Sequence, residues 1–401
     1  MFRSSFDYLI YGFSQLTIFI LGSIWLFRIG HIYIRIIILE RPLEILKELS
    51  QFPSVAFHEA LVANGIKNIL RNSRINFIED DFGNIIVELK GSNIEMPPIA
   101  FVAHMDHPGF EVQTISDNQI IASPLGGVPY SSIFNGADCF VLDNNGQRIS
   151  CSLVPIPDSS DRIVEVIDID SLKPKTPIFF NLEDFSIEGD FIYMRALDDL
   201  AGCAAIIAAL ENIMNNSLEN TVYAVFTRAE EVGLIGARLL AKSNILRLDS
   251  FVVSVETSSV VPGVVHNMGP VIRTGDASYT FDSQAEQILM MSSNNIKNEY
   301  PNFKFQRHLM DAGSCEASAF MAYGYRSTGI AFPLGSWHNA TTQIKDIDSG
   351  ISSEYIGTDD FLNGVILIQM AMEYGSTWEP DYISNRYKEV DDMFIKRLKE
   401  D

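Results

Sequence analysis

Short apolar runs alternate with helical segments along most of this chain, and this alternation limits the fold more than any other feature. Runs rich in Val, Ile, Ala and Phe are typical of strands buried on both faces of a sheet. They occupy residues 97–104, 221–228, 251–256 and 327–334. Helical patterns occupy residues 42–55, 58–72, 200–214, 233–242, 317–324 and 382–399. This succession predicts an α/β fold, with a mixed sheet covered by helices on both faces.

Residues 113–191 differ in character from the rest of the chain. They carry short strand signals, and the Asn-Asn-Gly turn ending at Gly146 predicts a β-hairpin. With 401 residues the chain is too long for one ordinary domain. We therefore expect a small β domain at 113–191, inserted into an α/β domain that comprises residues 41–112 and 192–401.

The first forty residues, 1–40, form a separate segment. The stretch from Tyr8 to Phe27 contains no charged residue. As a helix it is about 30 Å long, enough to cross a bilayer. Basic residues after the stretch outnumber those before it, so the positive-inside rule leaves the main domain in the cytoplasm, anchored to the inner face of the membrane. Two alternatives stay open: a buried helix of the core, or a start codon assigned too far upstream.

The acidic composition excludes one class of partner. The formal net charge is −22 and the isoelectric point is about 4.6, so the chain repels the phosphate backbone of nucleic acids. The four cysteines are scattered without a CxxC pair, which is typical of a reducing compartment and argues against a structural zinc knot. The seven histidines are sparse as well, so a metal site must draw mainly on carboxylates.

Histidine and acidic residues gather where the predicted strands end and a predicted helix begins. They are His104 and Asp106 after the first strand, Asp198 and Asp199 before the helix at 200–214, Glu230 and Glu231 after the second strand, Glu256 ending the third, and His338 beyond the fourth. The carboxyl ends of strands in an open α/β sheet face one crevice, so we expect these side chains to converge. Each pair alone is weak, since an Asp pair before a helix is usually a cap. Their joint occurrence predicts one site.

Two imidazoles and several carboxylates are the donors of a site for Zn²⁺, Co²⁺ or Mn²⁺. A carboxylate that bridges two ions about 3.5–4 Å apart makes a two-metal clamp, so we expect two divalent ions per chain, with zinc as the first choice. Asp106 is placed to hold the imidazole of His104 and so to support catalysis. Of Glu230 and Glu231, one would be a ligand and the other would take a proton from water.

Several stretches of the sequence occur, in the same order, in a known family. They are HMDHPGFEV, RALDDLAGCAAII, FTRAEEVGLIGA, SVETSS, the pair Gly269-Pro270, DAGSCEASAF and SWHN, within residues 41–375. On these motifs the chain resembles the co-catalytic metallo-aminopeptidases of the glutamyl-aminopeptidase and endoglucanase-like type, relatives of the di-zinc aminopeptidase and carboxypeptidase clan. The blocks around the Asp pair and EEVGLIGA are the specific ones.

The resemblance implies roles that the residues alone leave open. The implied metal ligands are His104, Asp198, Glu231, Glu256 and His338. Asp198 would bridge the two ions and be followed by a non-proline cis peptide, and Glu230 would be the general base. The inserted β domain would mediate homo-oligomerisation.

Three features depart from the family pattern. His107 stands where the family usually has an acidic residue, and Glu256 replaces a more usual Asp. Asp311 precedes a segment with GSCEA in place of the common GTDAG, and the inserted domain is shorter than typical. These departures bear on substrate preference and on the size of the assembly, and they leave the metal chemistry intact.

We therefore expect a metallo-aminopeptidase that removes N-terminal residues from short peptide substrates. A dipeptidase or an N-deacylase of the same clan would use the same metal core on a different amide. A deacylase needs a cation for the substrate's carboxylate, and the candidates are Arg195, Arg228, Arg273, Arg307 and Arg326. A rival of another class is a non-catalytic, membrane-tethered binding protein with a relict site, which the complete set of competent ligands argues against.

Overall fold

The computed structural model describes residues 40–116, 119–156, 162–342, 350–375 and 387–400. The chain divides into two compact units, Met1–Glu44 and Ile45–Asp401, and the fold described below is that of the second unit. The membrane span predicted at residues 8–27 lies outside the described residues. Within the described ranges, no helix has the length and apolar character needed to cross a bilayer.

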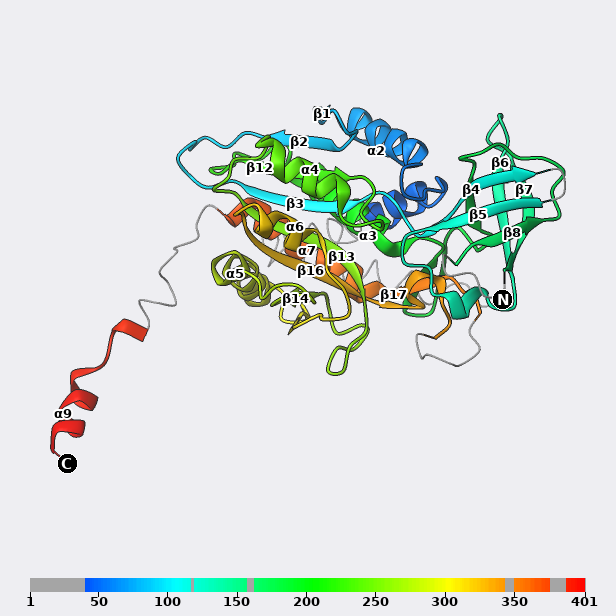
Figure 1. Ribbon diagram of the computed structural model, residues 1–401. Coiled ribbons are helices and arrows are strands. Elements are labelled where there is room, and N and C mark those ends of the chain that lie inside the picture. Colours follow the sequence, from blue (N-terminus) through cyan, green and yellow to red (C-terminus); the bar gives the residue numbers. More distant parts are fainter. Residues whose placement is uncertain (1–39, 117–118, 157–161, 343–349, 376–386, 401) are drawn as a thin grey trace, which may run out of the picture. The chain divides into compact units, whose positions relative to one another are not determined.

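A mixed sheet of eleven strands forms the main body of the second unit (Figure 1). Its central strands run parallel in the order β12 (Val222–Thr227), β3 (Ile99–His104), β13 (Phe251–Ser259) and β16 (Arg326–Gly335). Every residue of β3 and β12 is buried, because helices cover both faces of the sheet here. All four strands predicted from the apolar runs are confirmed.

The outer strands are short and mostly antiparallel. They are β1 (Phe77–Glu79) and β2 (Ile85–Leu89) at one side, β17 (Glu354–Gly357), β11 (Phe191–Met194) and β10 (Ser186–Glu188) at the other, and β14 (Val271–Arg273) with β15 (Gln306–His308) branching from β16. These strands are not predicted from the sequence, because strands of three to five residues are too short to show a clear period.

Helices pack on both faces of the sheet, as predicted. On one face lie α3 (Leu197–Ile213), α5 (Ser283–Glu299) and α7 (Thr358–Tyr374); on the other lie α4 (Ile235–Ser243) and α6 (Glu316–Ala322). Helix α3 is buried along nearly its whole surface, since its small and branched apolar residues surround the helix on all sides. Helix α2 (Ala60–Asn72) precedes the sheet. Of the C-terminal helix predicted at 382–399, residues 389–391 are not helical, and α9 (Asp392–Glu400), which follows them, has no buried residue.

A closed barrel of six antiparallel strands is inserted between β3 and α3 (Figure 1). Its strands are β4 (Gly109–Ser116), β5 (Gln119–Leu125), β6 (Ala137–Leu142), β7 (Arg148–Pro155), β8 (Val164–Ile167) and β9 (Pro177–Phe180). The predicted hairpin is the β6–β7 pair. The barrel strands span Gly109–Phe180, whereas the sequence pattern placed the insert at 113–191. Strands β10 and β11 pair into the main sheet instead. The predicted boundary missed this, because such short strands carry no local signal of the sheet they join.

Candidate functional site

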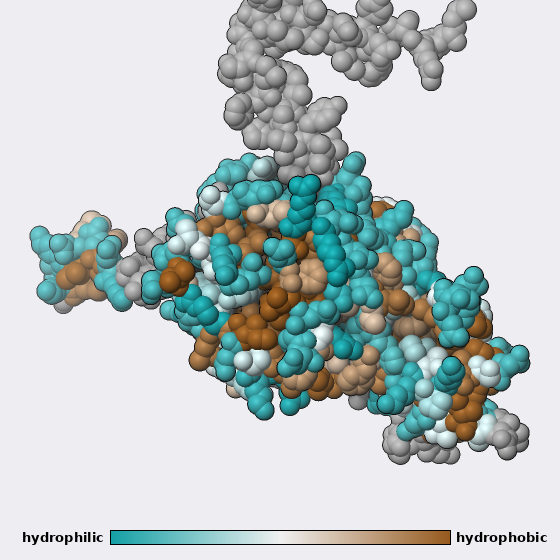
Figure 2. Space-filling model, turned by 90° about the horizontal axis from the view of Figure 1, so that it is seen from above, coloured by the Kyte–Doolittle hydropathy of each residue, from teal (hydrophilic) through white to brown (hydrophobic). Residues whose placement is uncertain are grey.

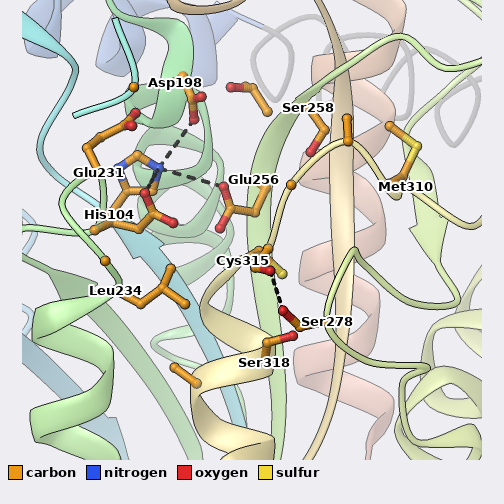
Figure 3. Close-up of a pocket in the computed structure, with 18 of the residues that line it drawn as sticks. His104, Asp198, Glu231, Leu234, Glu256, Ser258, Ser278, Met310, Cys315 and Ser318 are labelled. Atoms are coloured by element: carbon orange, nitrogen blue, oxygen red, sulfur yellow. Dashed lines mark hydrogen bonds and ion pairs between the residues drawn. The ribbon is translucent and has the colours of Figure 1, made fainter. Parts of the chain in front are cut away.

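The predicted site residues converge at the carboxyl ends of the parallel strands. His104 ends β3, Glu230 and Glu231 follow β12, Glu256 lies in β13, Asp198 lies in the first turn of α3, and His338 lies in the 3₁₀ turn η2 (Trp337–Asn339) after β16. One cavity of about 830 Å³ is lined by all six. Figure 3 shows His104, Asp198, Glu231 and Glu256 gathered in one part of the cavity, with Cys315 next to Glu256 and Ser278 and Ser318 beyond it.

Asp198 presents one carboxylate oxygen to each of the two histidines. Its Oδ1 lies 3.3 Å from His104 Nε2, and its Oδ2 lies 3.7 Å from His338 Nε2. Glu256 Oε2 lies 3.6 Å from His104 Nε2, and Glu231 Oε2 lies 3.4 Å from His338 Nε2 (Figure 3). Two ligand atoms about 2.1 Å from one tetrahedral ion are about 3.4 Å apart. The spacings in this cluster are therefore those of atoms that surround a cation.

Both imidazoles are held so that Nε2 faces the carboxylates. The Nδ1 atom of His104 donates to the carbonyl of Asp106 at 3.1 Å, and that of His338 donates to the carbonyl of Gly127 at 2.8 Å. A carbonyl can only accept, so a proton must sit on Nδ1, and in the neutral ring the lone pair is then on Nε2. This is the tautomer that a metal-ligating histidine needs.

The carboxylates of the cluster have oxygens without hydrogen-bond partners. Asp198 Oδ1 and Glu231 Oε1 are buried, and no described residue donates to either. Such atoms are costly unless something compensates for them, and a divalent cation would do so. Two triads have ligand atoms within 4.8 Å of one another, namely His104 with Asp198 and Glu231, and His104 with Glu230 and Glu256. The donor set fits divalent ions, and the position of Glu230, whose Oε2 lies 3.9 Å from His104 Nε2, is compatible with either a ligand or a base.

Burial and mutual repulsion disturb the protonation of the cluster. Burial raises the pKa of both Glu230 and Glu231 well above the usual 4.5. Burial lowers the pKa of His104, but the surrounding carboxylates, Glu230 first, outweigh it and hold that pKa well above 6.5. Burial lowers the pKa of His338 to about 4. The raised pKa values favour the protonated forms of Glu230 and Glu231 when no cation is bound, and cation binding would release those protons.

The loop that carries Glu230 and Glu231 is held by two buried carboxylates. Asp106 accepts the backbone N–H groups of Glu230 and Glu231 at 2.9 and 3.1 Å, while its own carboxylate lies 3.7 Å from His104 Nδ1. The carbonyl of Asp106, rather than its carboxylate, makes the closer contact with the imidazole. Glu59, which the sequence analysis did not single out, accepts the N–H of Ala229 at 3.0 Å and pairs with Arg228 at 2.7 Å.

Asp199 has a different role from its neighbour Asp198. The peptide bond between them is cis, as the family resemblance implied. Asp199 is fully buried and accepts the N–H of Gly202 at 3.1 Å. A Cβ at Gly202 would lie 2.4 Å from the Asp199 carboxylate, so this position of α3 has room only for glycine. The residues that line the cavity include Asp198 and not Asp199.

Three contributors to the site come from segments without a metal-ligand pattern. Gly127, which follows β5 of the barrel, packs so closely that a Cβ there would lie 2.9 Å from the His338 ring. His107 is buried between the carbonyl of Asp198 at 2.7 Å and Asn339 Oδ1 at 2.9 Å, and burial lowers its pKa. Glu354 of β17 accepts backbone N–H groups beside Asp198 and His338. His107 lies in the HMDHPGFEV motif, but neither its contacts nor those of a lone Gly or Glu can be read from the sequence, because the partners lie far along the chain.

Comparison with known proteins agrees with this architecture. The pattern of the M42 glutamyl aminopeptidase family matches residues 165–352. A relative from Acetivibrio thermocellus, named "Putative aminopeptidase", is 25% identical over 336 residues, which cover 77% of this chain and 96% of the relative.

Solved structures extend the likeness to the fold. The TET1 peptidase of Pyrococcus horikoshii, described as assembling into a tetrahedron or a large octahedral shell, has a TM-score of 0.69 at 24% identity, covering 82% of this chain and 98% of its own. An aminopeptidase from the archaeon Desulfurococcus kamchatkensis has a TM-score of 0.70 at 20% identity, covering 86% and 98%. The inserted barrel and the acidic, imidazole-lined cavity thus accompany a match to the M42 glutamyl aminopeptidase family over residues 165–352, and the chain is similar to that family of metallopeptidases.

Proposed function

We propose that this chain hydrolyses N-terminal residues from short peptides with two divalent ions held by five side chains. One ion would be held by His104, Asp198 and Glu256, and the other by Asp198, Glu231 and His338. The observation that carries this proposal is that Asp198 presents one oxygen to each histidine, which supports a shared, bridging carboxylate. Zinc is the first candidate for a site with two imidazoles and several carboxylates, and cobalt and manganese suit the same donors.

The chain's own residues would then handle the substrate and the protons. When bound, the two ions would polarise the scissile carbonyl and acidify the attacking water. Glu230 would accept the proton of that water and transfer it to the leaving amine. The acidic lining of the cavity would attract the α-ammonium group of a peptide.

One observation favours a second candidate, an N-deacylase. Among the five arginines considered for the substrate's carboxylate, four bind a carboxylate or amide side chain: Arg195 with Asp184, Arg228 with Glu59, Arg307 with Glu286, and Arg326 with Gln284. Arg273 lines the cavity, and no carboxylate among the described residues lies within ion-pair distance of it. It is 2% exposed and contacts Met310 O at 3.3 Å and Ser258 Oγ at 3.5 Å.

A single pair of substrates separates the two activities. One peptide is offered with a free and with an acetylated N-terminus, and product release is followed by mass spectrometry. The aminopeptidase proposal expects sequential loss of N-terminal residues from the free peptide and negligible cleavage of the acetylated one. Preferential cleavage of the acetylated peptide, together with its loss on Arg273→Met, would replace it with the deacylase.

We further propose that the chain forms a homo-oligomer through its barrel. Large apolar side chains are exposed on β7 and β8, namely Ile149, Val154 and Ile167. Figure 2 shows apolar residues reaching the surface between hydrophilic ones on the face it presents. Light scattering should give a mass of several chains for the unaltered protein and a smaller mass for Ile149→Glu. A monomeric mass for the unaltered protein would contradict the proposal.

The hydrophobic stretch at residues 8–27 motivates a proposal about location. If it spans a membrane, it would tether the catalytic domain to the cytoplasmic face. The full-length protein should then sediment with membranes and resist carbonate extraction, while a chain beginning at Glu40 should not sediment and should keep its activity. Recovery of the native protein with an N-terminus near residue 40 would show that the extension is not made.

A further inference from the structure

The carboxylate of Glu354 accepts hydrogen bonds from two backbone segments of the candidate metal centre, one that contains Asp198 and one that contains His338. Glu354 is fully buried in β17. Its Oε2 accepts the N–H groups of Leu197 at 2.8 Å and of Asp198 at 3.0 Å. Its Oε1 accepts the N–H of His338 at 2.9 Å. One side chain therefore satisfies the backbone of the shared carboxylate ligand and of the second histidine.

The sheet topology explains why this position can reach both segments. Strand β17 lies between β16 and β11, with Glu354 opposite Met194 at the end of β11. The chain leaves β11 to begin α3, where Asp198 lies, and it leaves β16 to form the turn that contains His338. Glu354 thus lies between the end of β11 and the end of β16, where the segments that carry Asp198 and His338 begin.

The turn around His338 needs an external restraint. Ser336, His338 and Asn339 have φ values of 52°, 52° and 61°, in the left-handed region that residues with a Cβ avoid. Such a backbone persists when surrounding contacts hold it in place. For His338, the hydrogen bond to Glu354 is such a contact, and the ring nitrogen is held separately by Gly127.

We infer that Glu354 is a positioning residue that sets the separation between Asp198 and His338, and so determines the affinity of one of the two cation sites. This inference rests on the proposed function, which makes both residues ligands. The site of Asp198, Glu231 and His338 depends on Glu354 at both ends. The site of His104, Asp198 and Glu256 depends on it at one end, because His104 is carried by β3 and is held by Asp106.

The variant Glu354→Gln tests this with little change in shape. An amide offers one oxygen and one NH₂ group, so at least one backbone N–H would face a donor in place of an acceptor. A matched control is Asp360→Asn, because Asp360 is likewise buried and accepts the N–H groups of Asn267 and Gly269 at 2.8 and 2.7 Å, away from the cavity.

Binding of Zn²⁺ to the metal-free, full-length proteins is measured by calorimetry. The unaltered protein should bind two ions. In Glu354→Gln one of them should bind about 10–100-fold more weakly, as expected when a residue that orients a ligand is lost, and the other should keep its affinity. Asp360→Asn should bind both as the unaltered protein does.

Two backgrounds identify which ion is affected. The variant His104→Ala leaves the His338 site. Adding Glu354→Gln to it should lower the affinity for the remaining ion about 10–100-fold. In His338→Ala, which leaves the His104 site, the same addition should change affinity less than about threefold. If Glu354→Gln does not fold, Glu354→Asp gives the same comparison, since its shorter arm cannot reach both segments.

The possible results separate this inference from the proposed function. Unchanged binding of both ions in Glu354→Gln, equal weakening of both, or the same selective loss in Asp360→Asn would each overturn the positioning role while leaving the ligands in place. Failure of the unaltered protein to bind any Zn²⁺, Co²⁺ or Mn²⁺ would overturn the proposed function itself.

Discussion

The backbone N–H of Glu230 donates to Asp106 Oδ1 at 2.9 Å across 124 positions of sequence. The other oxygen of the same carboxylate accepts the next N–H, that of Glu231, at 3.1 Å. Asp106 also offers its carbonyl to the ring of His104. One residue therefore fixes the end of β3 against the loop that follows β12, and with it the relative positions of an imidazole and two carboxylates.

Asp106→Asn should impair turnover more than substrate binding. The amide can accept from only one of the two N–H groups, so Glu230 and Glu231 would lose part of their orientation. We expect kcat to fall about 10–100-fold with KM changed less than about threefold. Steady-state kinetics on one free-amine peptide gives both constants. A rise in KM at unchanged kcat would show that Asp106 acts on substrate binding instead.

Glu230→Gln should separate metal binding from hydrolysis. The amide cannot accept the proton of the attacking water, so kcat should fall about 10²–10⁴-fold. Metal content, measured by elemental analysis, should stay at the level of the unaltered protein if Glu230 is the base. The exposed Glu95→Gln is the matched control and should keep full activity. Loss of one ion from Glu230→Gln would make Glu230 a ligand, the role that its proximity to His104 also allows.

The shared position of Asp198 predicts a pattern of metal stoichiometry. His104→Ala and His338→Ala should each bind one ion. The two histidines face different oxygens of Asp198, so each substitution removes a ligand of a different ion. Asp198→Asn should bind neither ion tightly, since it weakens a ligand that both ions share. Titration of the metal-free proteins with Co²⁺, followed by absorption, counts the ions. Retention of two ions by Asp198→Asn would refute the bridging role.

The metal-free protein should lose stability as the pH rises from about 5 to 8. Burial raises the pKa of Glu316 from 4.5 to about 8, so its protonated form is favoured in the folded state. Its stabilising contribution is present below the unfolded pKa and is lost as the pH rises through the folded one. Glu316→Gln cannot ionise, and its free energy of unfolding should fall less over this range, by on the order of 1–4 kcal/mol. Urea unfolding at several pH values measures this. Parallel pH profiles for the two proteins would rule out Glu316 as a contributor.

The sequence by itself determined the central strands, the covering helices and the identity of the clustered residues. Continuous apolar runs such as 97–104 show burial on both faces, and buried parallel strands place their carboxyl ends at one edge. His104, Glu231, Glu256 and His338 could be grouped from their positions at or after the ends of these runs, and Asp198 from its position before a helix, because strands that run parallel place their carboxyl ends at the same edge.

Only the tertiary structure decided how these residues face one another. The two oxygens of Asp198 divide between His104 and His338, and Glu354 reaches both segments because β17 pairs with β16 and β11. Gly127 reaches His338 from the end of a barrel strand. Such contacts depend on the register and order of short antiparallel strands, which are set by packing across more than a hundred residues. Local periodicity records which face of an element is buried, and it holds no information about the distant segment that buries it.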